Sequence, residues 1–370
     1  MNKTKSILLM IPVSILTIVS LCGCNNNSTN KEYFKLWNEC SSLTALKEYV
    51  EDVTNINSKN YIPVEDRIAT FDMDGTFIGE LCPSYFEYNM LEYRVLEDPT
   101  YKDLASESEI EAATNIREFV RNGTALPAHF DMIHANAAAK AYAGMTLTEF
   151  DNYVKDYGET PANGFVGLSN GGAFYQPMLE VFDYLEANDF TYYVVSGSDR
   201  FICRALVDAI DIEPNRVIGM DVVLASDNQG DEDGVNYTYT INDHLIRTDE
   251  LIIKNLKTNK VKQIAQEIGK VPVLSFGNSG GDSAMHNYCL SNPTYKSAAF
   301  MLVADDDARD HARKNVVEDG VKRLENDDEF NARITKLNTD WTNANYNVIS
   351  MKDDFKTIYG DGVRVVDFVF

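Results

Sequence analysis

The sequence predicts an α/β fold: a Rossmann-like, doubly wound parallel sheet with a helical cap insert and a small β-hairpin insert. Two observations predict it. Short apolar segments typical of buried strands alternate along the chain with segments of helical periodicity. Three of the apolar segments also run directly into clusters of Gly, Ser, Asn and Asp. Ligands bind at the carboxyl ends of strands in such sheets, so these clusters are candidate walls of a site.

Composition limits the class of protein. The chain has 370 residues, of which 44% are hydrophobic, and a formal net charge of -24. This size and composition describe a globular protein of one or two domains. The negative charge argues against a general binder of nucleic acid or of anionic membranes. An anionic substrate would need a local cation or metal, and the sequence indicates no protein partner.

The N-terminus has the pattern of an export signal. Lys3 and Lys5 precede an apolar run at residues 7–19, and Leu-Cys-Gly-Cys follows at residues 21–24. This ending is similar to a bacterial lipobox, so we expect residues 1–23 to be a signal peptide and Cys24 to carry lipid. The protein would then be an extracytoplasmic lipoprotein anchored in a bacterial membrane. A plain membrane anchor or an uncleaved signal is the alternative.

Four cysteines would remain beside the lipidated one: Cys40, Cys82, Cys203 and Cys289. Their wide spacing matches no metal-binding pattern. We expect mostly buried free thiols, although an exported protein could form one disulfide.

The elements of the chain follow in order. Residues 24–60 should form a tether and an N-terminal helix, and residues 61–80 and 160–370 the α/β core. Residues 81–159 should form the helical cap, in which Ser108 and Glu111 have capping-box spacing at a helix start. The expected core strands cover residues 67–71, 190–195, 216–219 and 271–276, with helices at 177–188, 201–210 and 261–268. A hairpin insert at about 221–250 is expected from the alternating apolar and polar residues of 235–241.

The first strand end carries two acids two residues apart, Asp72 and Asp74, within DMDGT. On an extended chain both side chains point to the same side. Carboxylates that close together favour a bound cation or a shared proton, because like charges repel. Capping acids in an Asp-Gly turn are the structural alternative.

Four such segments together resemble the haloacid dehalogenase superfamily, most of whose members are phosphatases. DMDGT at residues 72–76 is similar to its first motif and Ser196, at the end of an apolar run, to its second. Lys260 opens a helix, as in the third motif, and FGNSGGDSAM at residues 276–285 is similar to the fourth. The resemblance spans about residues 62–360, is patchy in the cap, and is to an exported bacterial branch near the phosphorylcholine and phosphoserine phosphatases.

The resemblance implies a role for each motif. Asp72 would attack phosphorus and form an aspartyl phosphate, and Asp74 would act as general acid and base. Ser196, the amide of Gly197, and Lys260 would bind the phosphoryl oxygens. Lys254 and Lys257 are competitors for the role of Lys260, with a solvated face as their expected alternative.

The resemblance also implies a magnesium site. Its ligands would be Asp72, the backbone carbonyl of Asp74, and Asp282, with Asn278 in support. Asn278 departs from the family, where aspartate is frequent at this position. A phosphate-cradling loop is the alternative for the glycine turn, which however lacks the Lys-Ser/Thr pair of a P-loop.

For several other residues a structural role is expected or is an alternative to a functional one. The histidines show no metal-ligand spacing, and Asp305, Asp306 and Asp307 are expected in a solvated loop. For Arg204 the alternatives are a contact with phosphate and a salt bridge within its helix. For the aromatic residues of the cap the alternatives are lining a substrate pocket and packing in the core. These histidines and aromatic residues are His129, His134, His244, His286, His311, Tyr85, Phe86 and Tyr88.

The sequence therefore predicts a Mg²⁺-dependent phosphomonoester hydrolase acting on a small phosphomonoester that resembles phosphocholine or phosphoserine. Both substrates carry a cation, which suits an acidic protein. The alternatives are a lipid-anchored phosphotransferase, which would pass the phosphoryl group to an alcohol, and a binding lipoprotein that has the fold without the chemistry. A mere binder would not need Asp74.

Overall fold

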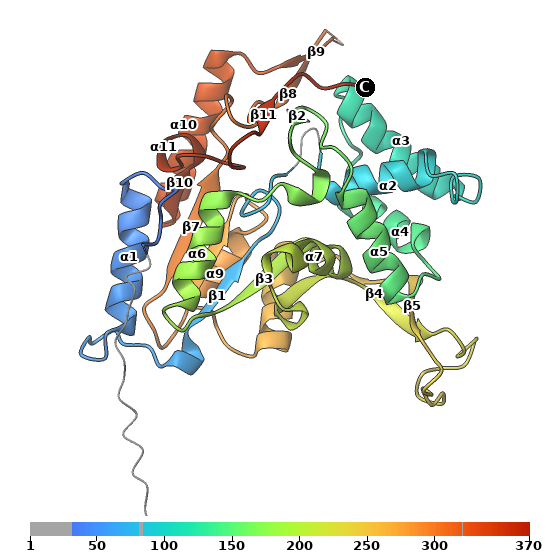
Figure 1. Ribbon diagram of the computed structural model, residues 1–370, viewed down its shortest axis with the longest axis horizontal. Coiled ribbons are helices and arrows are strands. Elements are labelled where there is room, and N and C mark those ends of the chain that lie inside the picture. The colour runs from blue at the N-terminus through green and yellow to red at the C-terminus, as the bar shows by residue number, and fades with distance from the viewer. Residues whose placement is uncertain (1–31, 81–83, 320) are drawn as a thin grey trace, which may run out of the picture. The chain divides into compact units, whose positions relative to one another are not determined.

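The computed structural model describes residues 32–80, 84–319 and 321–370 and has a seven-stranded sheet at its centre (Figure 1). The strand order is β10-β7-β6-β1-β3-β4-β5, and all neighbours are parallel except β4 and β5. This arrangement confirms the predicted α/β fold with a mostly parallel sheet. The seven strands are β1 (Ile68–Phe71), β3 (Thr191–Asp199), β4 (Val217–Ser226), β5 (Leu245–Ile253), β6 (Leu274–Gly277), β7 (Ala298–Val303) and β10 (Asn347–Ser350).

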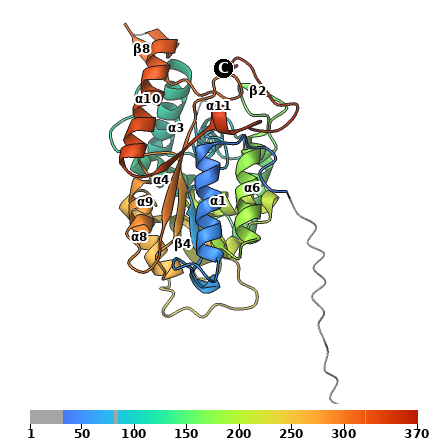
Figure 2. The same ribbon diagram turned by 90° about the vertical axis from the view of Figure 1, so that its left-hand side faces the viewer.

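Helices cover both faces of this sheet (Figure 2). On β7, Phe300 and Leu302 join one apolar cluster with helices α1, α6 and α7, whereas Ala299 and Met301 join another that faces α10. The alternation follows from the period of two along a strand and shows that both faces are buried. The core helices are α1 (Ser41–Thr54), α6 (Gln176–Glu186), α7 (Arg200–Val207), α8 (Thr258–Gln263), α9 (Ser283–Leu290), α10 (Asp327–Asn343) and α11 (Met351–Asp354).

The central position of β1 brings the motifs together. Phe71, its last residue, lies beside Val194 of β3 and beside Phe276 of β6 in parallel register. The three strands therefore run to one edge of the sheet, where the polar residues after β1, in the last part of β3 and after β6 meet. The rings of Phe71 and Phe276 stack with centroids 4.3 Å apart, which fills the sheet surface directly beneath the motifs.

The cap is helical, as its composition predicts. Its helices are α2 (Phe86–Leu96), α3 (Glu107–Asn122), α4 (Phe130–Ala141) and α5 (Leu147–Gly158). The capping box of α3 is formed by Ser106 and Glu109, so the prediction of Ser108 and Glu111 was wrong by two residues. Both pairs have the same spacing, and Glu109 is the one that turns inward, where its side chain is buried.

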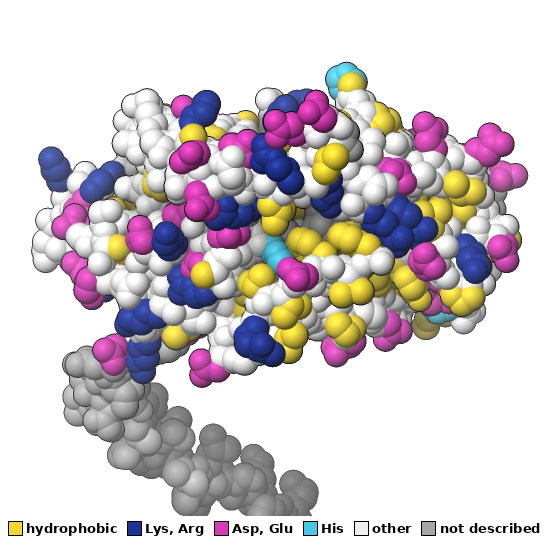
Figure 3. All heavy atoms as spheres, turned by 90° about the horizontal axis from the view of Figure 1, so that it is seen from above, with side chains coloured by type: hydrophobic (Ala, Val, Ile, Leu, Met, Phe, Trp, Pro, Cys, Tyr) yellow, Lys and Arg dark blue, Asp and Glu magenta, His cyan; other side chains and the backbone are white. Residues whose placement is uncertain are grey.

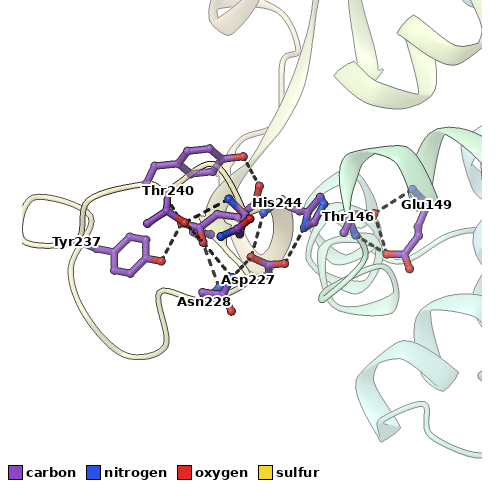
Figure 4. A network of polar contacts seen from close by, with 11 residues as sticks. Thr146, Glu149, Asp227, Asn228, Tyr237, Thr240 and His244 are labelled. Atoms are coloured by element: carbon purple, nitrogen blue, oxygen red, sulfur yellow. Dashed lines mark hydrogen bonds and ion pairs between the residues drawn. The ribbon is translucent and has the colours of Figure 1, made fainter.

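The predicted hairpin consists of β4 and β5, which pair in antiparallel fashion, but the alternating segment 235–241 is not a strand. It lies in the long connection between them, where Asp243 accepts hydrogen bonds from the Tyr237 hydroxyl at 2.8 Å and the Thr240 amide at 2.8 Å. His244 bonds Asp227 across the base of the connection, on the side of Thr146 and Glu149 of the cap (Figure 4). Side-chain bonds thus replace strand pairing in this connection.

Arg247 of the hairpin contacts both the core and the cap. Arg247 of β5 donates to Asp199 at 2.7 Å, and both side chains are almost fully buried. The Arg247 guanidinium also lies 4.0 Å from the centroid of the Phe150 ring of α5. The Gly144 amide donates to the Arg247 carbonyl at 2.8 Å, so backbone and side chain both hold the cap on this strand.

Smaller elements complete the chain. The 3₁₀ turns are Val64–Asp66, Asn170–Gly172, Asp208–Ile210 and Pro214–Arg216, and a π-helical turn, Ile264–Ile268, extends α8. Two small antiparallel pairs are β2 (Phe165–Val166) with β11 (Arg364–Val365), and β8 (Asn315–Glu318) with β9 (Val321–Leu324). Acidic and basic side chains are interspersed over the face of the molecule in Figure 3, so the net charge is not gathered on that face.

The predicted signal peptide and lipidation site, Cys24, lie outside the described residues, as does Cys82. Among the residues described, Cys40, Cys203 and Cys289 are free thiols, and the last two are buried. A search of the described helices finds none whose length and apolar character would allow it to cross a membrane.

Candidate active site

A cavity of about 100 Å³ lies at the carboxyl ends of β1, β3 and β6. Core residues from the first, third and fourth motifs line it, and the second motif contributes Gly197 and Ser198. Residues of the cap close the opposite side, among them Tyr85, Tyr88 and Asp131. The sequence segments that resemble one family thus meet around a single cavity between core and cap.

Lys260 joins two of the predicted acids. Its ammonium lies 2.5 Å from Asp72 Oδ1 and 2.7 Å from Asp282 Oδ1, and its side chain is buried. Burial and the charge of Asp282 raise the pKa of Asp72, whereas Lys260 outweighs burial and lowers the pKa of Asp282. Both acids raise the pKa of Lys260 in turn, against the effect of burial. One buried cation therefore serves two carboxyl groups, which leaves one net negative charge when both acids are ionised.

Asp74 is a carboxyl group suited to proton transfer. Burial is the main cause that raises its pKa to about 7, with a further contribution from the charges of Glu87 and Glu80. The hydroxyl of Ser198 donates to Asp74 Oδ2 at 2.7 Å and opposes that rise. A carboxyl group with a pKa near neutrality exchanges a proton readily at neutral pH, which is what a general acid and base requires.

The glycine turn after β6 is wrapped around the carboxylate of Asp282. Its Oδ2 accepts from the amides of Asn278 at 3.2 Å and Ser279 at 3.0 Å, and from the Ser279 hydroxyl at 3.2 Å. A side chain at Gly277 would collide with Asp282, whose Cβ lies 2.6 Å from the position of a Cβ atom there. Both oxygens of Asp282 are thus engaged, one with Lys260 and one with the turn.

Ser196 and Ser198 occupy different places. Ser196 is fully buried, and its Oγ accepts from the amide of Ser198 at 3.0 Å, behind the cavity wall. Gly197 and Ser198 lie on the wall itself. Phosphate binding by Ser196 stays a prediction, and the hydroxyl of Ser198 is a second candidate that the sequence analysis missed.

Lys254 and Lys257, the alternatives to Lys260, differ in burial and in their contacts. Lys257 is exposed and lies outside the cavity lining. Lys254 is buried, so its expectation as a solvated residue was wrong. Its ammonium lies 2.8 Å from Glu87 of α2, in the wall of the cavity. Lys260 is the lysine that contacts Asp72, as predicted.

Glu87 gathers several donors beneath the cap. Besides Lys254, it accepts from the Asp199 amide at 3.2 Å and lies 3.7 Å from Nδ1 of His134. Burial would raise the pKa of Glu87, but Lys254 and His134 outweigh it and lower this pKa. Burial lowers the pKa of His134 to about 4, so this histidine is neutral at neutral pH. The cluster joins the cap to the core at the site.

The remaining candidates have structural contacts. Arg204 donates to the Pro214 carbonyl at 2.9 Å, away from the cavity lining. Asp305 and Asp306 are buried, so the prediction of a solvated loop was wrong for them, whereas exposed Asp307 pairs with Arg313 at 2.6 Å. The Ser350 hydroxyl and the Lys352 amide donate to Asp305, which explains its inward position. Ordinary partners hold the other histidines: His244 bonds Asp227, His286 bonds Ser275 and His311 bonds the Gly164 carbonyl, and His129 precedes α4.

Aromatic residues of the cap divide between site and core. Tyr85 and Tyr88 line the cavity, whereas Phe86 is buried and packs on Tyr157 with ring centroids 5.3 Å apart. The hydroxyl of Tyr88 donates to Asp131 at 3.4 Å. The cap thus presents a tyrosine and an acid side by side to the cavity.

The donors of the cavity suit magnesium in their chemistry. Within residues 32–80, 84–319 and 321–370, no three His, Cys, Asp or Glu side chains form a ready-made metal cluster. Asp72, Asp74 and Asn278, whose side chains carry oxygen donors, nevertheless line the same cavity. Mg²⁺ is typically held by one or two carboxylates together with water and substrate phosphate, and it does not need an all-protein cage. The oxygen donor set therefore fits this ion.

DMDGT follows β1 of a mostly parallel sheet, Lys260 lies between that motif and the glycine turn, and the cap is helical; this arrangement agrees with the resemblance of the four motifs to the haloacid dehalogenase superfamily. No family model and no curated protein sequence matches the chain.

Among solved structures, one reaches a TM-score of 0.50 and others match the chain at lower scores. A conserved protein of unknown function from Anaerococcus prevotii has a TM-score of 0.50 at 14% identity, covering 86% of this chain and 94% of its own. A phosphoserine phosphohydrolase-like protein from Francisella tularensis has a TM-score of 0.35 at 14% identity, covering 64% and 88%. A haloacid dehalogenase family hydrolase from Salmonella enterica serovar Typhi has a TM-score of 0.34 at 12% identity, covering 64% and 62%.

Proposed function

We propose that the protein is a Mg²⁺-dependent phosphomonoester hydrolase that acts through an aspartyl phosphate on Asp72. One observation carries the proposal: Lys260 contacts both Asp72 and Asp282 while Asp74, with a pKa of about 7, lies in the same cavity. A nucleophile, a charge-neutralising cation and a proton donor are the three groups that phosphoryl transfer to an acid requires.

The reaction has two steps. A carboxylate oxygen of Asp72 forms a bond to phosphorus as the bond to the leaving oxygen breaks, and Asp74 gives that oxygen its proton. Water then attacks the phosphorus of the aspartyl phosphate, Asp74 takes the proton of that water, and Asp72 leaves as a carboxylate. Lys260 and the donors at Gly197 and Ser198 balance the charge of the phosphoryl oxygens.

In this proposal Asp72, the Asp74 carbonyl and Asn278 would hold the metal. Asp282, whose oxygens already accept from Lys260 and from the turn, would act on it through bound water. The bound cation would supply neutralisation of phosphoryl charge and orientation of the substrate.

Cap residues suggest the substrate class. Asp131 and Tyr88 of the cap line the cavity together with the motif residues, so the leaving group of a substrate bound at Asp72 would lie near them. Carboxylates and aromatic faces both attract an ammonium group. A small phosphomonoester with a cationic head, similar to phosphocholine or phosphoserine, is therefore the proposed substrate. The N-terminal pattern supports an extracytoplasmic enzyme held in the membrane by lipid on Cys24.

The proposal is tested by hydrolysis of p-nitrophenyl phosphate with and without Mg²⁺. The wild-type chain should hydrolyse it, Asp72→Asn should not, and Asp103→Asn, at an exposed position of the cap, should match wild type. An inert wild type would contradict the enzymatic function. A panel of phosphomonoesters then tests the substrate class, because equal rates with glycerol phosphate and sugar phosphates would remove the cationic preference.

A further inference from the structure

We infer that Glu80 belongs to the cation site and supplies the negative charge that Asn278 does not carry. The inference rests on the proposed metal-dependent function and concerns a residue outside the four motifs. Its starting observation is that the Asn278 amide donates to Glu80 Oε1 at 2.7 Å, at the edge of the cavity that holds Asp72 and Asp282.

The turn after β1 brings Glu80 to this place. The Gly75 amide donates to the Ile78 carbonyl at 2.7 Å, so the chain reverses immediately after Asp74. Gly75 has a φ of 75°, and a Cβ atom there would clash with the Asn278 amide and lie 2.9 Å from Glu80 Cγ. Only glycine therefore lets the two side chains meet above this backbone.

The direction of the hydrogen bond decides which atom is left for a cation. An ionised carboxylate only accepts, so Asn278 must donate through Nδ2. Oδ1 is then the atom that Asn278 can offer to the ion or to its bound water. An aspartate at position 278 would have no proton to donate and would face Glu80 as a like charge. Neutral Asn278 and the additional acid, Glu80, are thus complementary in charge and in hydrogen bonding.

The local charge supports the same assignment. Asp72 and Asp282 share Lys260, which leaves one net negative charge among the three groups when both acids are ionised, as they would be around a bound cation. Glu80 adds a second negative charge at the cavity edge, so that the set balances a divalent cation. Lys314 lies 3.6 Å from Glu80 Oε2 but is mostly exposed, and such a pair is weak in water.

A purely structural role is the alternative, in which Glu80 only orients Asn278. The test is the affinity of the full-length chain for Mn²⁺, measured by electron paramagnetic resonance of the free ion without substrate. Four proteins are compared: wild type, Glu80→Gln, the double variant Glu80→Gln/Asn278→Asp, and Glu111→Gln, which removes one exposed acid of α3. In the double variant the amide and the acid exchange places and their hydrogen bond is retained.

We expect Glu80→Gln to weaken Mn²⁺ binding by roughly tenfold or more, because a divalent ion loses a nearby unit charge. The double variant should return to within about threefold of wild type, and Glu111→Gln should bind as wild type does. Unchanged binding by Glu80→Gln would overturn the inference. So would a double variant as weak as Glu80→Gln. A wild type that binds no Mn²⁺ would instead contradict the metal-dependent function itself.

Discussion

Replacing Lys254 by Met should destabilise the protein strongly, because it leaves the carboxylate of Glu87 buried without its cation. The two charged groups lie 2.8 Å apart, and each side chain is only 6% exposed. Removal of one partner of such a pair typically costs about 3–5 kcal/mol of the free energy of unfolding. The Asp199 amide remains as a donor to Glu87, so the lower part of this range is expected.

Urea unfolding followed by circular dichroism measures this change. Glu87→Gln/Lys254→Met removes both charges, and we expect it to recover most of the lost stability, because no uncompensated charge is then buried. Lys257→Met is the control, since Lys257 is exposed and three residues away. A loss of less than about 1 kcal/mol in Lys254→Met would refute the view that this pair is desolvated.

The same substitution has a spectroscopic consequence. The pKa of His134 is lowered to about 4, mainly by burial; Glu87 opposes this shift and Lys254 adds to it. Without Lys254, His134 is the nearest group that can supply a positive charge to Glu87, at 3.7 Å. Its pKa should therefore rise in Lys254→Met, and an NMR titration of the imidazole would contradict the reasoning if the pKa stayed the same or fell.

Four further predictions concern single groups. Burial raises the pKa of Asp74 to about 7, so kcat/KM with an alkyl phosphate should fall as the pH rises past about 7, whereas Asp74→Asn should lose about 10²–10⁴-fold in rate. Burial lowers the pKa of His286 from 6.5 to about 4. As the pH is lowered from 6.5 to 4, the unfolded state takes up a proton that the folded state does not, so the free energy of unfolding should fall by up to about 3 kcal/mol. The fall should be smaller in His286→Gln. Asn278→Asp should bind Mg²⁺ more tightly and keep turnover at saturating metal within roughly tenfold of wild type, which is about 1.4 kcal/mol in the barrier. Asp282→Asn should raise the metal requirement strongly. If Asp282→Asn and wild type gave the same Mg²⁺ titration, this account would be contradicted. Cys24→Ala should leave the membrane fraction and stay active, and retention there would mean that the apolar segment is the anchor.

The sequence predicted those parts of the site that depend on short segments. An apolar strand followed by a polar turn is a local pattern, so the ends of β1 and β6 were placed correctly, and Lys260 was correctly expected to contact Asp72. The order of the motifs sufficed to bring them to one edge, because parallel strands share their carboxyl ends.

Contacts between distant segments could not be predicted in this way. Lys254 and Glu87 are separated by the rest of the cap and a large part of the core, and nothing in their local sequence shows that they pair. The alternating residues 235–241 satisfy a strand pattern, yet Asp243 binds the segment through side-chain and backbone donors. Asp305 appeared solvated because its partners, Ser350 and Lys352, come from the far end of the chain.

The most direct test of the central claim is to trap the phosphorylated enzyme. Full-length wild type is mixed with Mg²⁺ and radiolabelled p-nitrophenyl phosphate, quenched in acid, and digested to map the label. The account predicts an acid-stable, base-labile acyl phosphate on the peptide that contains Asp72, and no label in Asp72→Asn. Hydrolysis with the label on another residue, or undiminished hydrolysis by Asp72→Asn, would contradict it.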